Sequence, residues 1–471
     1  MKIVFASAEI FPFAKSGGLA DIAHALPAAL GEKADVTVVM PLYRFIDKER
    51  FCIRPTGEHF VLNFGRETYD VEIFAGACEG KEVLFVYNRL LCDRDHLYGP
   101  PGEGYEDNDV RFSIFCRAIV ELVKIHSFEI MHLNDWHTAL AALIAHDEGV
   151  RAKIVYTIHN LAYQGIFPAE SLERTGIAKR HFNMEELEFY GEVNWMKGGI
   201  AHADAVTTVS PSYAVEIQEA EYGCGLDGFM RKHNGKLKGI LNGIDYSIFD
   251  PLSDPSIPER FDSENLEGKS LCKESFLREA GFDIDKYELP LFIFIGRFTE
   301  QKGIELIVEA AKKLARLPLL LAILGEGERK YREQLRSICD RYPNIAVKFG
   351  YDEALSRRMY AAADFLLMPS RFEPCGLNQM IAMRYGAIPV VHAVGGLRDT
   401  VHPIESNEPL CGLGFRFEKM EAADFLDAVK RALSLYAALH KMQRTREFDM
   451  SCDFSVGRCA KRYLELYRSL L

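Results

Sequence analysis

The chain has 471 residues, 48% of them hydrophobic and 26% charged, which is typical of a globular protein too long for a single compact core. Its 68 acidic residues outnumber its 56 lysines and arginines, and the net charge of −12 argues against nucleic-acid and membrane partners. Eleven cysteines without a C-x-x-C pair favour a reducing compartment. With no signal peptide and no run of roughly 18 apolar residues, we expect a cytoplasmic protein.

Short apolar runs alternate with helical patterns in the first half of the chain and predict a parallel sheet covered by helices on both faces. The range 51–87 differs, because its tighter alternation predicts an antiparallel hairpin insertion. The predicted parallel strands are residues 2–8, 36–40, 130–133, 153–158, 205–209 and 237–241.

The first predicted strand leads into the segment Lys15-Ser16-Gly17-Gly18-Leu19, followed by an amphipathic helix over residues 19–30. Paired glycines let a ligand approach the backbone at a helix N-terminus, and the lysine adds a positive charge for an anionic group. Asp21 lies in the first turns of this helix. The alternative interpretation is a tight turn that binds nothing.

Polar residues also follow two later strands of the first half. Asp135 and Trp136 follow the strand at 130–133, and His159 and Asn160 follow the strand at 153–158. Ligands bind at the carboxyl ends of parallel strands, so these residues are candidate contacts. Trp136 suits glucan recognition because aromatic faces pack on sugars, although it could equally belong to the core. A histidine after a strand is more often a structural hydrogen-bonder than a catalyst.

The βα pattern restarts after residue 289 and predicts a second domain. The turn signal Asn242-Gly243-Ile244-Asp245 and the polar stretch 249–269 predict the connection, with a hinge near 243–250 and domains of 1–245 and 246–454. The predicted strands are 289–295, 319–324, 344–349, 364–368 and 388–392, and the predicted helices are 303–316, 328–341, 354–362 and 376–385.

Candidate binding residues follow the strands of the second domain as well. Arg297 and Lys302 stand five positions apart in one loop, so both could reach one pyrophosphate, with Gln301 assisting. The alternative is a pair of solvated loop charges. Glu373 could hydrogen-bond sugar hydroxyls, and Gly376 could leave backbone N–H groups open to an anion at a helix N-terminus.

Three of these segments resemble signatures of the bacterial glycogen synthases and plant starch synthases. They are the K-x-G-G-L match Lys15-Ser16-Gly17-Gly18-Leu19, the G-R-x-x-x-Q-K-G match at 296–303, and the donor-sugar match Arg371-Phe372-Glu373-Pro374-Cys375-Gly376-Leu377. The resemblance implies an α/β fold with two doubly wound Rossmann-like domains facing across a cleft, the GT-B architecture. It also implies that a final helix, 455–471, returns to the first domain.

The resemblance further implies a retaining transferase that moves α-glucose from ADP-glucose to the nonreducing end of an α-1,4-glucan. In such enzymes the carbonyl of the residue matching His159 stabilises charge at the anomeric carbon. The implied catalytic set is Lys15, His159, Arg297, Lys302 and Glu373. The implied donor contacts are Lys15, Gly17, Gly18, Asp21, Asp135, Asn160, Asn242, Arg297, Gln301, Lys302, Tyr351, Glu373, Cys375, Gly376 and Leu377, and the implied acceptor contacts are Tyr105, Asn108 and Trp136.

One position narrows the resemblance to a single branch of the retaining transferases. Many retaining transferases of this architecture carry a second glutamate eight residues after the first, whereas this chain has Ile381 there, as the starch and glycogen synthase branch does. Without a pair of carboxylates for double displacement, we expect front-face substitution, with no metal and no cofactor.

Other function classes remain open from the sequence. A nicotinamide dehydrogenase would share the doubly wound sheets, but the first strand lacks G-x-G-x-x-G. A noncatalytic glucan-binding protein would need no cationic diphosphate clamp. Among transferases, the alternatives are a UDP-glucose enzyme and one that uses a small sugar acceptor. Oligomeric state is not predicted.

Overall fold

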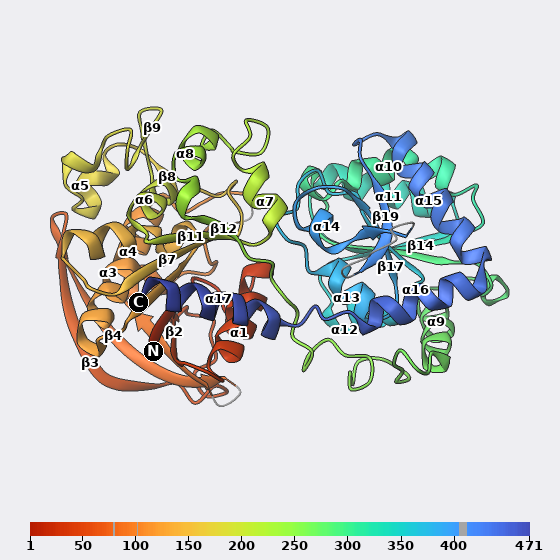
Figure 1. Cartoon of the computed structure of the whole chain (residues 1–471), viewed down its shortest axis with the longest axis horizontal. Helices are drawn as coiled ribbons and strands as arrows, with labels where there is room; N and C mark the ends of the chain where they lie inside the picture. Colours follow the sequence, from red (N-terminus) through yellow and green to blue (C-terminus); the bar gives the residue numbers. More distant parts are fainter. Residues whose placement is uncertain (79–80, 101, 405–411) are drawn as a thin grey trace. The chain divides into compact units, whose positions relative to one another are not determined.

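The computed structural model describes residues 1–78, 81–100, 102–404 and 412–471 (Figure 1). The chain divides into two compact units: unit 1 comprises Met1–Asn242 with Val456–Leu471, and unit 2 comprises Gly243–Ser455. The boundary between them lies at the Asn242-Gly243 peptide, inside the turn signal of the sequence. Each unit has a large sheet of its own.

Unit 1 is built on a nine-stranded sheet in the order β12-β11-β7-β6-β1-β2-β5-β4-β3. Strands β12 to β5 in this order pair in parallel, and only the β5-β4 and β4-β3 pairs are antiparallel. The strands are β1 (Lys2–Ala6), β2 (Asp35–Pro41), β3 (Arg54–Phe64), β4 (Glu67–Cys78), β5 (Lys81–Tyr87), β6 (Ile130–Asn134), β7 (Lys153–Ile158), β11 (Ala205–Thr208) and β12 (Leu237–Gly239).

The region 51–87 forms antiparallel pairs as predicted, and these pairs extend the main sheet. Strand β5 pairs in parallel with β2, with Val38 opposite Val83 and Met40 opposite Phe85, so the hairpin continues the main sheet. The physical reason is that β5 carries consecutive apolar residues, Val83 to Val86, all of which are buried. Such a run belongs inside a sheet rather than at its edge.

The helices of unit 1 include two that the site depends on, α1 before β2 and α4 before β7. A short sheet in the order β8-β10-β9, which the sequence did not predict, lies in the chain between β7 and α6. The bounds are α1 (Gly18–Leu30), α2 (Arg89–Cys92), α3 (Asn108–His126), α4 (Trp136–Asp147), β8 (Ile166–Phe167), α5 (Ser171–Thr175), η1 (Lys179–His181), β9 (Glu188–Phe189), β10 (Glu192–Asn194), α6 (Trp195–His202), α7 (Pro211–Glu216), α8 (Asp227–Lys232), η2 (Asn234–Lys236) and α17 (Val456–Leu470).

The final helix, α17, belongs to unit 1 and packs against α1, as the dark blue helix of Figure 1 shows. Its Tyr467 hydroxyl lies 2.6 Å from Nδ1 of the buried His132, whose Nε2 lies 2.7 Å from the Thr157 hydroxyl. Burial lowers the pKa of His132 to about 3, so the ring is neutral in this network. Hydrogen-bonded buried polar groups therefore fix the helix on the sheet.

Unit 2 is built on a parallel seven-stranded sheet in the order β15-β14-β13-β16-β17-β19-β18. The five predicted strands are present, whereas β18 and β19 were missed. The strands are β13 (Leu291–Ile295), β14 (Leu320–Gly325), β15 (Ile345–Phe349), β16 (Phe365–Met368), β17 (Ile388–His392), β18 (His402–Pro403) and β19 (Leu413–Phe417).

The four helices predicted in this half are present, and α13 is shorter than its predicted range of 376–385. Apolar side chains of α10 and α15 pack on the sheet in one buried cluster that includes Phe292, Ile307, Phe365 and Phe425. The helices are α9 (Glu267–Glu279), η3 (Ile284–Lys286), η4 (Glu300–Lys302), α10 (Ile304–Leu314), α11 (Arg329–Arg341), α12 (Glu353–Ala362), α13 (Asn378–Arg384), α14 (Gly395–Thr400), α15 (Ala422–Ala437) and α16 (Leu439–Ser451).

The stretch 249–269, predicted as a connection, is fixed to unit 2. Asp254 is 2% exposed and accepts a hydrogen bond of 2.5 Å from the Tyr385 hydroxyl. Lys269 lies within α9 and is also buried, where its ammonium group donates to the carbonyl of Tyr385 at 2.7 Å. Polar composition here reflects side chains that anchor the segment rather than a solvated linker.

The described cysteines agree with the predicted lack of a disulfide framework. The nine described cysteines form no disulfide, and Cys78 and Cys411 lie outside the described side chains. Among the described residues, no helix combines the length and the apolar character needed to cross a membrane.

Candidate functional site

In unit 1 the loop between β1 and α1 presents an open helix N-terminus. Gly17 is the N-cap of α1, and no described side chain caps it by a hydrogen bond. A Cβ atom at Gly17 would meet no described atom within 4 Å, so the space in front of the helix is open. Backbone N–H groups at such an end can receive an anion.

The lysine of this loop is already paired. Lys15 Nζ lies 2.6 Å from Asp21 Oδ1, and both side chains are about three-quarters buried. Asp21, predicted as a donor contact, is thus a partner of Lys15 in the structure. An incoming phosphate would compete with this carboxylate for the ammonium group.

Glu9, which the sequence analysis missed, holds the same loop. Its Oε1 accepts hydrogen bonds from the Ser16 hydroxyl at 2.5 Å and from the Tyr98 hydroxyl at 2.6 Å, and the Ser16 N–H also donates to its carboxylate. Glu9 is only 3% exposed. An isolated acid in the apolar stretch after the first strand was the available signal, because glutamate is rarely buried without partners.

The ends of β6 and β7 bring Asp135 and His159 together. Asp135 Oδ1 accepts the backbone N–H of His159 at 2.7 Å, and His159 Nε2 lies 2.9 Å from Asn134 Oδ1. Asp135 has a φ of 56°, a left-handed conformation that is strained for this residue type. Its carboxylate therefore faces the backbone of the His159 loop, which differs from the predicted contact with a sugar.

Burial sets the charge states of this pair in opposite directions. Desolvation raises the pKa of Asp135 to about 7 and lowers the pKa of His159 to about 3. His159 is therefore neutral near pH 7, and its side chain supplies no positive charge. The neighbouring Asn160 accepts the Ala162 N–H through Oδ1 at 3.0 Å and shapes the turn after β7.

The residues predicted to bind the acceptor are buried to different degrees. Asn108 is 6% exposed and uses both ends of its amide internally, donating to the Tyr98 carbonyl at 2.8 Å and accepting from Arg111 at 2.6 Å. A direct glucan contact by this side chain does not fit such burial. Tyr105 is half-buried, and its ring lies 5.0 Å from the Arg111 guanidinium.

Trp136 fits the core interpretation better than the acceptor interpretation. Its ring contacts Phe112 and Trp195, with centroids 5.0 and 6.2 Å away. A Cβ atom at Gly165 would lie 2.7 Å from the indole ring, so the glycine is required for this packing. The side chain keeps only partial exposure.

In unit 2 the predicted cation Lys302 meets Glu373 at the ends of β13 and β16. Lys302 Nζ lies 2.7 Å from Glu373 Oε2, and the Ser370 hydroxyl donates to the same oxygen at 3.0 Å. Glu373 is 5% exposed, so its charge depends on these partners. Arg297 donates to Gln301 Oε1 at 3.2 Å in the same loop.

Glycine is required where this loop meets β16. Gly303 has a φ of 68°, and a Cβ atom there would lie 1.8 Å from the carbonyl oxygen of Pro369. Gly396 is equally enclosed, with its Cβ position 2.2 Å from the Cys375 carbonyl oxygen, and its N–H donates to the Glu373 carbonyl at 3.0 Å. The backbone of the donor-sugar segment is thus held by two neighbouring loops.

The N-terminus of α13 differs from the predicted anion site. The helix begins at Asn378, whereas Gly376 has a φ of 73° and lies in the preceding loop with Leu377. A helix of one to two turns has a weak dipole, so any contribution of Gly376 and Leu377 must come from individual N–H groups. Cys375 is buried, which leaves its backbone as the part able to face a ligand.

Two further predicted contacts lie at the ends of their elements. Tyr351 follows β15 and is 72% exposed, so its ring can receive a base. Asn242 ends unit 1, is 6% exposed, and its Oδ1 has no hydrogen-bond partner among the described residues. A buried acceptor without a partner can accept a bond from a ligand.

Comparisons with known proteins agree with this architecture. Residues 2–232 match the family Starch synthase catalytic domain, and residues 282–447 match the family Glycosyl transferases group 1. Glycogen synthase of Aquifex aeolicus (strain VF5) is 44% identical over 100% of this chain and 99% of its own length. Glycogen synthase of Koribacter versatilis (strain Ellin345) is 41% identical, with 99% and 98% covered.

A solved structure is similar over the whole chain. It is the catalytic domain of Starch Synthase IV from Arabidopsis thaliana, bound to ADP and acarbose, with a TM-score of 0.92, 34% identity, and coverage of 100% of this chain and 99% of that one. The two α/β units, each built on a sheet of mainly parallel strands, define a glycosyltransferase of GT-B architecture. The chain belongs to the glycogen synthase and starch synthase family.

Proposed function

We propose that this protein transfers α-glucose from ADP-glucose to the nonreducing end of an α-1,4-glucan, in glycogen biosynthesis and with retention of configuration. The observation that carries the proposal is the pairing of Lys302 with the buried Glu373 at the carboxyl ends of β13 and β16. Family membership supports the reaction, and the similar starch synthase was solved with ADP.

In unit 2, Glu373 would accept hydrogen bonds from hydroxyls of the glucose being transferred. Lys302 already contacts Glu373, which would hold the sugar. Lys302 and the neighbouring Arg297 would therefore contact the pyrophosphate that is attached to this sugar. Gln301 would orient Arg297, as its amide oxygen does in the structure. The exposed ring of Tyr351 would stack on the base.

In unit 1, Lys15 and the α1 N-terminus would act on the phosphate groups of a nucleotide sugar. Lys15 would exchange Asp21 for a phosphate oxygen, and the N–H groups after Gly17 would assist. The carbonyl of His159 would stabilise the positive charge at the anomeric carbon. A neutral His159, fixed by Asp135, suits that role because an imidazolium would repel the developing charge.

The proposed reaction is front-face substitution. The bond between the anomeric carbon and the diphosphate oxygen breaks, and a bond to the acceptor 4-hydroxyl oxygen forms on the same face. The departing diphosphate oxygen takes the acceptor proton, and the cations stabilise its charge. Ile381, which is 5% exposed, offers no carboxylate for a covalent intermediate.

We also infer that the enzyme works in the cytoplasm, a reducing compartment that suits the nine described cysteines, which form no disulfide. The proposed mechanism assigns no step to a metal or a cofactor.

A donor comparison tests the proposal directly. Purified protein is incubated with glycogen and either ADP-glucose or UDP-glucose, and nucleotide release and chain elongation are measured together. We expect ADP release that matches elongation. Turnover with UDP-glucose alone would identify the alternative donor, elongation of a small sugar alone would identify the alternative acceptor, and no elongation with either donor would refute the proposal. Lys302→Ala should lower turnover and donor affinity together.

A further inference from the structure

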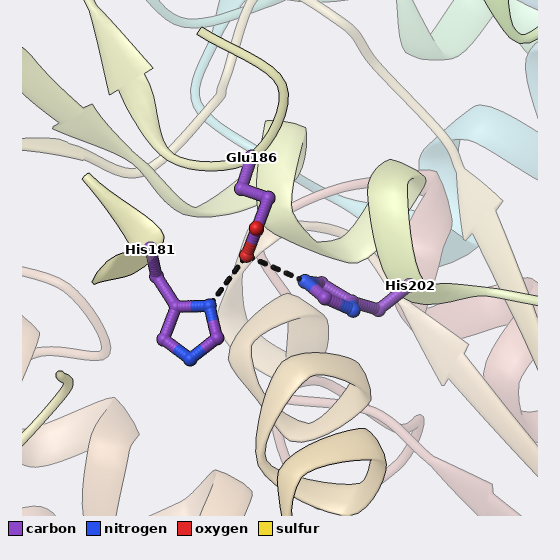
Figure 2. A group of neighbouring side chains, drawn as sticks. All are labelled: His181, Glu186 and His202. Carbon is purple, nitrogen blue, oxygen red and sulfur yellow. Dashed lines mark hydrogen bonds and ion pairs between the residues drawn. The ribbon is translucent and has the colours of Figure 1, made fainter. Parts of the chain in front are cut away.

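A second group of polar side chains lies in unit 1 away from the proposed donor residues. Nδ1 of His181 and Nε2 of His202 point at the same carboxylate oxygen of Glu186, as Figure 2 shows, with the His202 contact at 3.1 Å. The nitrogen and oxygen atoms of the three residues lie within 4.8 Å of one another. Two imidazoles and one carboxylate form a ligand set suited to zinc and related cations.

The side chains of His181 and Glu186 each have a second contact that fixes their orientation. The other ring nitrogen of His181, Nε2, lies 2.8 Å from Asp147 Oδ2. Oε1 of Glu186 accepts the Asn183 side-chain amide at 3.2 Å, which leaves Oε2 facing the two histidines. A carboxylate behind a histidine is the usual outer partner of a metal-binding imidazole, because it selects the tautomer whose opposite nitrogen is a free ligand.

The hydrogen bonds of His181 are difficult to satisfy with protein atoms alone. The side chain is 5% exposed, and each of its nitrogens faces a carboxylate oxygen. A neutral imidazole has one N–H, so it can donate to only one of the two acceptors. A cation where Nδ1, Glu186 and His202 converge would satisfy the ring nitrogen that cannot donate.

We propose that His181, Glu186 and His202 bind a divalent transition-metal ion of the zinc class, with Asp147 supporting His181. Tetrahedral ligands that each lie about 2.0–2.2 Å from one zinc ion are roughly 3.4 Å apart, so the two histidine nitrogens would move slightly away from the Glu186 oxygen to admit the ion between them. The fourth position is left for water.

The topology indicates that this ion is structural. Asp147 ends α4 and His202 ends α6, and these helices lead into the starts of β7 and β11. His159 follows the carboxyl end of β7, whereas α4 leads into the amino end of the same strand. The group of His181, Glu186 and His202 therefore lies at the amino ends of the parallel strands. The ion would connect the segment around η1 to α4 and α6, and the inference does not depend on the proposed reaction.

The full chain, dialysed against EDTA, is titrated with Zn²⁺ by calorimetry and by thermal melting. We expect one tight site and a Tm increase of about 5 °C at saturation. Co²⁺ in place of Zn²⁺ should give the visible absorption of a tetrahedral complex. Glu186→Gln and His202→Gln should each weaken Zn²⁺ binding at least about tenfold, and Asp147→Asn about tenfold through loss of support.

His59→Ala is the matched control, because His59 and Asp70 form an exposed histidine–carboxylate pair with their atoms 3.7 Å apart. Its binding and Tm increase should equal those of the unaltered chain. Zn²⁺ binding that survives Glu186→Gln, or a Tm that does not respond to Zn²⁺, would overturn the inference. Unchanged turnover of the EDTA-treated chain is expected, and loss of turnover would contradict the structural role.

Discussion

The two groups of proposed donor residues are built differently. In unit 2, Lys302 and Glu373 are 71 positions apart in the chain and meet only because two loops are packed against each other. In unit 1, Lys15 and Asp21 are six positions apart and pair within one loop and helix turn. The first arrangement depends on tertiary packing, whereas the second depends on local structure that the buried Glu9 anchors.

This difference separates two kinds of preorganisation. The Lys302–Glu373 pair is largely buried, so removing one partner leaves an uncompensated charge. The Lys15–Asp21 pair is more exposed and can exchange partners at lower cost. We therefore expect unit 2 substitutions to affect activity most strongly, and the following predictions test that order.

The largest effect is expected for Glu373→Gln. The amide cannot accept the same hydrogen bonds from sugar hydroxyls, and Lys302 loses its counter-charge. We expect kcat/KM for the nucleotide sugar to fall about 10²–10³-fold. Steady-state kinetics measure this, with Glu279→Gln as the control because its partner Arg358 forms an exposed pair elsewhere in unit 2. Equal effects of the two changes would contradict the assigned role.

Gly303→Ala should destabilise unit 2 and reduce activity. The added methyl group would lie 1.8 Å from the Pro369 carbonyl oxygen, so the loop that carries Lys302 must move. We expect a loss of roughly 3 kcal/mol or more in stability, above the 1 kcal/mol or so of strain at a positive φ. Gly281→Ala is a matched control, with φ of 74° and no described atom within 4 Å of its Cβ position. Thermal melting of both variants gives the comparison.

Glu9→Gln tests the anchor of the unit 1 loop. An amide keeps one acceptor but loses the charge that strengthens the bonds from Ser16 and Tyr98. We expect stability to fall by about 1.5–3 kcal/mol and kcat/KM to fall about tenfold. Ser16→Ala removes one of these bonds and should show a smaller loss of the same kind. A stable Glu9→Gln variant with normal kinetics would show that the loop is held by other contacts.

Asp135→Asn should lower activity least, and its effect on stability should depend on pH more than that of any variant above. Burial raises the folded pKa of Asp135 to about 7, above its unfolded value of about 4. The stability from this group is therefore complete below about pH 4 and is lost as pH rises towards 7. The Tm of the unaltered chain, relative to that of the variant, should fall between about pH 4 and pH 7 and then level off. A constant difference would mean that Asp135 does not titrate in this range.

The elements that the sequence predicted well have a direct physical signature. Strands such as β7 and β17 are continuous apolar runs with buried residues, and their bounds match the predicted ranges. Strand β19 was missed, since it contains a glycine and an arginine among its five residues. The antiparallel pairing within 51–87 was predicted from its alternation, whereas the parallel pairing of β5 with β2 was not predicted.

Much of the candidate site was visible as motifs, and the partners of its residues were not. Lys15, Lys302 and Glu373 lie in recognisable segments. Only the structure shows that Lys302 contacts Glu373 and that Asp135 binds the His159 loop. Trp136 was assigned to the acceptor by residue type, and its packing depends on Trp195, which a distant segment contributes. Asn108 was assigned from the resemblance, which does not show its bonds to the Tyr98 carbonyl and Arg111.

Local composition was sufficient to determine which stretches become strands, where the loops with glycine and lysine lie, and which family the chain resembles, since these depend on residues close in sequence. Contacts between distant residues were decided only by the fold. Three features show this: the burial of Glu9, the raised pKa of Asp135, and the convergence of His181, Glu186 and His202. At each of these places, elements that are separate in the sequence pack together and exclude water. Desolvation of that kind depends on three-dimensional packing, and no linear pattern encodes it.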